Sequence, residues 1–230
     1  MIVSTYRPYF APFSGFFEKI MRSDVMVILD SVQFPLGRSW LTRNRFKDDK
    51  GIHWIRVPVW KRGKGIQRIN EVGICYERGW ADKALRGLSM AYKNSPYFSE
   101  HISFWQNLLK ENINRLLDLN LKIIRYVMDY LHIDTELILL SDLGIEEKEP
   151  MLTMSICKRL KTDNFLAQKS ARKYMDPELF QKEGIEPCFF LPCAPLYPQL
   201  WGEFIPNLSI FDLMFNCGPK TVDIIKRDMR

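Results

Sequence analysis

Long hydrophobic runs are missing from this sequence. No stretch approaches the roughly 18 apolar residues that a membrane-spanning helix requires, so we expect no membrane span. Near the start, Arg7, Pro8 and Pro12 interrupt the apolar residues before a secretory hydrophobic segment of about seven residues can form. The sequence therefore predicts a cytoplasmic protein.

Histidine and cysteine are too few and too irregularly spaced to indicate a metal centre or a disulfide framework. The three histidines, His53, His101 and His132, show no HxH or HxxxH spacing, and the five cysteines form no CxxC pair. We therefore expect no metal ion and no cofactor. Most of the cysteines, Cys217 included, are expected to be reduced thiols in the core rather than nucleophiles.

Phosphate-binding glycine loops are also absent. The first residues contain neither the glycine spacing of a Walker loop nor that of a dinucleotide-binding turn. One weaker anion site is left, the free amides of a helix that begins near Gly15, with Lys19 one turn further in.

Apolar residues, by contrast, are plentiful. Of the 230 residues 47% are hydrophobic and 26% charged, which is enough for a core and far from the composition of a disordered chain. The length predicts one α/β domain over residues 1–230. The net charge of +6 is spread along the chain, and no nucleic-acid-binding pattern accompanies it. We expect a small-molecule substrate and no nucleic acid, and no oligomeric state is predicted.

Alternating strand-like and helix-like segments predict the fold class. Residues 25–30, VMVILD, form an apolar run typical of a strand covered on both faces of a parallel sheet. A strand at Ile2 and Val3 and a helix with Ser14 as its N-cap precede it, as in a βαβ unit. Further strands are expected near 135–140, 164–167 and 185–191, and further helices near 122–131, 150–160, 176–180, 207–215 and from 221. This pattern favours an α/β fold with a largely parallel sheet, flanking helices and a helical insertion at about 80–132.

A polar and basic segment, residues 31–50, is the best candidate for a ligand-facing loop. Pro35 and Gly37 interrupt it, and it carries Gln33, Arg43, Asn44, Arg45 and Lys47. Long loops in compact domains are commonly functional or mobile. The segment that follows, residues 53–59, is rich in β-branched and aromatic residues and predicts a strand edged by Pro58.

Two aspartates are candidates for site residues. Asp30 ends the 25–30 strand, at the edge of a parallel sheet where ligands bind; the alternative is that Asp30 stabilises a turn. Asp212 interrupts an apolar helix pattern, so it either faces a polar cavity or forms a structural hydrogen bond. His53 is favoured as a core or surface residue over a catalytic base.

Several long stretches resemble the WbqC-like protein family. They are RPYFAPFSGFFEKIMRSDVMVILDSVQF from residue 7, TRNRFKDDKGIHWIRVPV from residue 42, Trp80 through AYKNSPYF, the SDL at Ser141, and LYPQLWGEFIPNLSIFDLMFNCGP from residue 196. The resemblance covers nearly the whole chain. It implies a transferase of bacterial surface-polysaccharide or secondary-metabolite biosynthesis that moves an acyl or aminoacyl group to an amino sugar or another amine.

The resemblance also implies a set of site residues at the C-terminal ends of the sheet strands. We interpret Asp30 and Asp212 as catalytic, positioning or deprotonating the acceptor. Lys19, Arg45 and Lys47 would hold the phosphate or carboxylate of a sugar nucleotide or a carrier-bound acyl donor. The other expected substrate-binding residues are Tyr9, Gln33, Asn44, Tyr197, Gln199, Asn207, Ser209 and Asn216. This interpretation requires residues near 30, 44, 199 and 212 to converge on one cavity.

The sequence departs from the family pattern at several positions. Tyr6 and Arg7 replace the usual His-Gln before Pro8, and Ala84 stands where a histidine is typical. Gln168 and Ser170 replace glycines. A mechanism that uses those histidines as bases, or those glycines to admit a phosphate, is therefore not carried over to this chain.

Two other functions stay open. The first is nucleotidyl transfer, with the basic segment Lys169–Lys173 over the phosphates; stabilisation by ATP or CTP with magnesium would indicate it. The second is a non-catalytic binding or assembly protein that has lost the family histidines. Its contact surface would use the tryptophans Trp40, Trp54, Trp60, Trp80 and Trp201.

Overall fold

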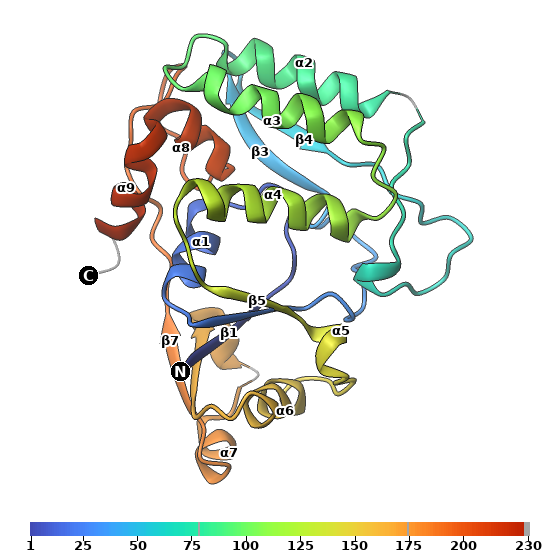
Figure 1. Ribbon diagram of the computed structural model, residues 1–230, viewed down its shortest axis with the longest axis vertical. Helices are drawn as coiled ribbons and strands as arrows, with labels where there is room; N and C mark the ends of the chain where they lie inside the picture. Colours follow the sequence, from blue (N-terminus) through green and yellow to red (C-terminus); the bar gives the residue numbers. More distant parts are fainter. Residues whose placement is uncertain (78, 174, 228–230) are drawn as a thin grey trace.

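A parallel sheet forms the centre of the molecule in the computed structural model, which describes residues 1–77, 79–173 and 175–227 (Figure 1). Its five strands run in the order β5-β2-β1-β6-β7, and every neighbouring pair is parallel. Their bounds are β1 Ile2–Tyr6, β2 Val25–Ile28, β5 Glu136–Leu139, β6 Asn164–Gln168 and β7 Glu186–Phe190. The predicted α/β fold is confirmed.

Helices cover both faces of this sheet. Successive side chains along β2 point to opposite faces and are buried on each. Met26 and Ile28 belong to a large apolar cluster that includes α1 (Ser14–Met21) and α4 (Leu116–Tyr130). Val25 and Val27 belong to a second apolar cluster that includes α6 (Met151–Arg159). Figure 1 shows α1 and α4 on one side of the strands and α6 on the other.

The polar segment 31–50 is not one long loop, as the sequence predicted. Its last part forms β3 (Arg43–Asp48), which pairs antiparallel with β4 (Gly51–Arg56) in a hairpin apart from the main sheet. Asn44 and Phe46 point inward at 2% and 0% exposure. Contacts with α2 (Trp80–Tyr92) and α8 (Ile210–Cys217) cover this inner face. Such packing makes a strand of a segment whose composition is mostly charged.

The remaining elements are short, apart from α3, and connect this framework. They are η1 (Ile69–Glu71), α3 (Phe98–Lys110), α5 (Leu140–Leu143), η2 (Lys169–Lys173), α7 (Pro177–Lys182), η3 (Gly218–Lys220) and α9 (Thr221–Arg227). Among the described residues, no helix combines the length and the apolar character needed to cross a bilayer.

The start of α1 differs from the prediction. Phe13, not Ser14, is the N-cap residue, and no side chain caps the helix. A Cβ atom at Gly15 would lie 2.5 Å from the Cβ of Pro192 and 2.6 Å from the Phe13 ring. Protein atoms therefore cover the first turn, which does not favour the anion site expected there.

Candidate functional site

A cavity of about 1130 Å³ opens at the C-terminal edge of the parallel sheet. Ligands of open α/β sheets bind at this edge because loops, rather than packed strands, follow it. Residues at or after the ends of four strands contribute to the wall: Thr5, Tyr6, Leu29, Leu140, Ser141, Ala167 and Gln168. The sequence predicted a pocket at this edge.

Lys19 brings an amine to the cavity wall from the middle of α1. Its side chain is only 4% exposed, and its Nζ donates a hydrogen bond to the carbonyl of Thr5 at 2.8 Å. The same Nζ lies 4.9 Å from the centre of the Tyr6 ring. Within the described part of the chain, no carboxylate forms an ion pair with it. Burial penalises the ammonium form and lowers the pKa of Lys19 to about 7.

Asp30 lies behind the cavity wall rather than in the cavity. It is 1% exposed, and its carboxylate accepts hydrogen bonds from the Ser141 hydroxyl at 2.7 Å and backbone amide at 3.0 Å. The amide of Asn70 donates to it at 3.2 Å. Ser141 and Asn70 both line the cavity. Asp30 therefore holds the start of α5, directly after β5, and the short helix η1 in their positions.

Tyr6 and Gln168 face each other across neighbouring strands. The Gln168 side-chain amide donates a hydrogen bond to the Tyr6 hydroxyl, and the Tyr6 ring packs 5.4 Å from Tyr9 and 4.5 Å from Phe16. Burial, and then the neighbouring Tyr9, raise the pKa of Tyr6 above its ordinary value, so its hydroxyl stays protonated. Two positions at which the sequence departs from the WbqC-like pattern thus contact each other.

Charged side chains of both signs line the outer part of the cavity. Glu149 accepts hydrogen bonds from the Thr153 hydroxyl at 2.9 and 2.8 Å, and burial raises its pKa. Arg68 and Glu146 form an ion pair of 3.1 Å. Arg7 is exposed, lines the cavity and has no ion-pair partner among the described residues. Gln33 and Tyr9 complete this part of the wall.

Asp212 lies in a second polar cluster, on α8. It is 1% exposed and accepts hydrogen bonds from the hydroxyls of Tyr92 at 2.7 Å and Tyr197 at 2.9 Å. Burial raises its pKa, while the two tyrosine hydrogen bonds act in the opposite direction. Lys47 donates to Gln199 at 3.1 Å and to the Glu203 carbonyl at 2.6 Å.

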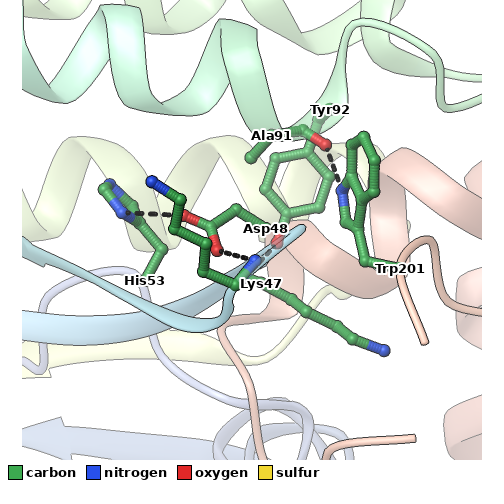
Figure 2. Close-up of polar contacts among 7 residues, drawn as sticks. Lys47, Asp48, His53, Ala91, Tyr92 and Trp201 are labelled. Atoms are coloured by element: carbon green, nitrogen blue, oxygen red, sulfur yellow. Dashed lines mark hydrogen bonds and ion pairs between the residues drawn. The ribbon is translucent and has the colours of Figure 1, made fainter. Parts of the chain in front are cut away.

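Figure 2 shows how this second cluster ties the hairpin to α2. The backbone amide of Lys47 donates to the Tyr92 hydroxyl at 2.9 Å, and the Lys47 side chain extends away from Asp48 and His53. The Trp201 indole donates to the Ala91 carbonyl at 2.7 Å. His53 lies 3.4 Å from Asp48, at the turn end of the hairpin.

The other predicted site residues join loops in this second region. Asn44 donates to the carbonyls of Phe10 and Ala11, and Arg45 donates to the Asn207 carbonyl at 2.7 Å. The side chains of the remaining three form hydrogen bonds to the backbone of residues nearby in the sequence: Gln199 to Ile205, Ser209 to Phe211, and Asn216 to Asp212.

The expectation that residues near 30, 44, 199 and 212 converge on one cavity is therefore wrong. Lys19, Tyr9 and Gln33 line the cavity and Asp30 supports its wall, whereas none of the residues grouped around Asp212 is among its lining residues. Hydrogen-bond donors and acceptors already surround Asp212 and Asn44, which explains why their polar groups can be buried without a ligand. The catalytic role of Asp212 stays a prediction.

Sequence reasoning gave no role to Ser141, Asn70, Glu149 or Gln168. The position in the sequence could have indicated two of them. Ser141 directly follows the strand predicted at residues 135–140, and Gln168 directly follows the strand predicted at residues 164–167. Among the described residues, no group of three or more His, Cys, Asp or Glu side chains is arranged to hold a metal ion.

The sequence of this chain was compared with those of known protein families and proteins. The family model described as WbqC-like protein family matches residues 7–224. The chain belongs to the WbqC-like protein family. A curated relative, "Uncharacterized protein Rv1507c" of Mycobacterium tuberculosis (strain ATCC 25618 / H37Rv), is 30% identical over 227 residues, 97% of each chain. No solved structure matches this WbqC-like chain.

Proposed function

We propose that this WbqC-like protein is a transferase that moves an acyl or aminoacyl group onto a primary amine, such as that of an amino sugar. The observation that carries this proposal is Lys19, a buried amine with a lowered pKa on the wall of a large cavity. An acceptor amine is protonated near neutral pH and must lose a proton to attack a carbonyl. A base with a pKa near the working pH is best suited to remove it.

The proposed reaction uses the neutral form of Lys19. The acceptor nitrogen attacks the acyl carbonyl, the new C–N bond forms, and the bond to the donor's leaving group breaks. Lys19 takes one proton from the acceptor ammonium and passes it to the leaving group, and the second proton that the nitrogen loses as the amide forms is released to solvent. A lysine held in a low-dielectric site can act in this way, whereas an arginine cannot.

Other residues of the wall have supporting roles in this proposal. Asp30 is a positioning residue, because it acts through Ser141 rather than on the substrate. The carboxylates of Glu146 and Glu149 attract a cationic acceptor, and Arg7, which has no ion-pair partner in the described part of the chain, offers its guanidinium to an anionic donor. Tyr9 and Gln33 offer neutral contacts. The cellular context proposed is surface-polysaccharide or secondary-metabolite biosynthesis.

The test is amide formation by the purified chain. A set of acyl and aminoacyl thioesters is incubated with amino sugars and amino-sugar nucleotides, and products are followed by mass spectrometry. We expect an amide product whose rate rises as the pH passes through about 7, where Lys19 loses its proton. Lys19→Met and Lys19→Arg should each lower the rate by about a hundredfold or more.

Lys110→Met is the matched control, because Lys110 is exposed at the end of α3. It should retain the wild-type rate. Retention of the full rate in Lys19→Met would contradict the proposal. Stabilisation by ATP or CTP with magnesium, without any amide product, would instead favour nucleotidyl transfer.

A further inference from the structure

The outward face of the β3–β4 hairpin carries arginines and tryptophans. Side chains alternate along a strand, so Arg43 and Arg45 point away from the inward-facing Asn44 and Phe46. In the register of the hairpin, Arg43 pairs with Arg56 and Arg45 pairs with Trp54. These residues do not line the cavity at the edge of the main sheet.

Stacking holds two of these arginines in place. The Arg43 guanidinium lies 4.4 Å from the centre of the Trp54 ring, and Trp54 stacks on Trp40 at 5.8 Å with an interplanar angle of 28°. The Arg45 guanidinium lies 5.7 Å from the Trp40 ring. A stacked guanidinium keeps its in-plane N–H groups for other partners. The two indoles cover one face of each other, while Trp40 is still 41% exposed.

The positive charge of this face is not neutralised. Among the described residues, Arg38, Arg43 and Arg56 have neither a hydrogen bond through their side chains nor an ion pair with a carboxylate. Burial, and then the nearby charges of Arg38 and Arg56, lower the pKa of Arg43. Arg45 differs, because it donates to the carbonyls of Pro206 and Asn207.

We propose that Arg38, Arg43 and Arg56 form a binding site for a di- or triphosphate group, separate from the cavity. Three neighbouring guanidinium groups without a carboxylate match an anion that carries several negative charges. Arginine forks bind phosphate oxygens in a bidentate manner. This surface recognises the anion through its guanidinium groups, whereas single-stranded nucleic acid would also stack a base on an aromatic ring such as the exposed Trp40.

Isothermal titration calorimetry with inorganic tripolyphosphate and pyrophosphate, without magnesium, tests the proposal. We expect binding that weakens as salt is added. Arg43→Gln and Arg38→Gln should each lower the affinity by about tenfold or more. Arg43→Lys keeps the charge but loses the fork and the stack, so it should also bind more weakly. Arg159→Gln removes an exposed charge on α6, on the far side of the main sheet from the hairpin, and should bind like the wild type.

Circular dichroism melting verifies that the variants fold, and Arg38, which is exposed and has no side-chain hydrogen bond or ion pair among the described residues, gives the cleanest comparison. Equal binding by wild type and the Arg38 and Arg43 variants would overturn the proposal, as would no binding at all. Equal affinity for citrate would overturn the assignment to phosphate. Tighter binding of single-stranded DNA than of tripolyphosphate would show that a nucleic acid is the true ligand. None of these results depends on the transferase function.

Discussion

Lys19 shows how burial can favour the neutral form of a side chain. The residue sits in a helix whose neighbours Phe16, Phe17 and Ile20 are fully buried. The backbone carbonyl of Thr5 gives its amine one hydrogen bond but no negative charge. Among the described residues no carboxylate pairs with the amine to offset its desolvation, and the pKa falls. The sequence placed Lys19 near the ligand but predicted a charged, anion-binding role, because burial cannot be seen in residue type alone.

Tyr6 and Gln168 lead to a prediction about their coupling. Tyr6→Phe removes the hydroxyl that accepts from Gln168, and it should destabilise the protein by about 1 kcal/mol. Gln168→Ala should cost a similar amount, and the double variant should cost less than the sum. Urea denaturation of the four proteins gives this double-mutant cycle. Strictly additive effects would show that the hydrogen bond contributes nothing to stability.

Among the strands, β3 is the one that sequence patterning missed, whereas β4 (Gly51–Arg56) overlaps the strand predicted at residues 53–59. Of residues 43–48 only Phe46 is apolar, so the segment has the composition of a solvated loop. Its strand character comes from pairing with β4 and from the helices that cover Asn44 and Phe46. By contrast, β2 was predicted within two residues, because a fully buried parallel strand leaves a continuous apolar run in the sequence.

The contact between α8 and the hairpin leads to a prediction about Asp212. Asp212→Asn leaves one acceptor oxygen for two buried tyrosine hydroxyls, and it should destabilise the protein by about 2–4 kcal/mol. If Lys19 is the base, the proposed transferase activity should persist in the folded variant, because Asp212 does not line the cavity. Asp118→Asn, an exposed change on α4, is the control in urea denaturation. An Asp212→Asn variant that is stable but inactive would indicate that Asp212 takes part in the reaction.

The packing of α3 against α4 should make the protein sensitive to acid. His101 is fully buried, its Nδ1 lies 2.8 Å from the Tyr126 hydroxyl, and burial lowers its pKa to about 4. The unfolded chain, with a histidine pKa of about 6.5, binds more protons between these values. Stability should therefore fall as the pH drops from about 6.5 towards 4, by about 2–3 kcal/mol in total from this group.

His101→Phe tests the acid sensitivity, because it keeps an aromatic ring against Phe215 and Tyr130. The free energy of unfolding, measured by urea denaturation from pH 7 to pH 4, should decline less steeply in this variant than in the wild type. His132→Asn alters an exposed histidine and should leave the slope unchanged. An identical decline in all three proteins would assign the acid sensitivity to carboxylates instead.

In the molecule as a whole, the cavity lies at the C-terminal edge of the parallel sheet, and the residues grouped around Asp212 do not line it. The alternation of strands and helices was sufficient to predict the sheet and the location of a pocket at its C-terminal edge. It was not sufficient to predict which loops meet there, since that depends on packing between segments such as η1 and the turn after β5. Family resemblance grouped Asp30 with Asp212, but the fold separates them into the cavity wall and the hairpin region.

The central claim is that burial lowers the pKa of Lys19 to about 7 in the folded protein, so that its neutral form is present near physiological pH. An NMR titration of protein labelled with ¹³C at lysine Cε tests it most directly, with the Lys19 signal assigned from its loss in Lys19→Arg. The account predicts one lysine signal that titrates with a midpoint of about 7, well below the ordinary lysine pKa of about 10.4. A Lys19 signal that titrates together with the surface lysines, above about pH 9.5, would contradict it.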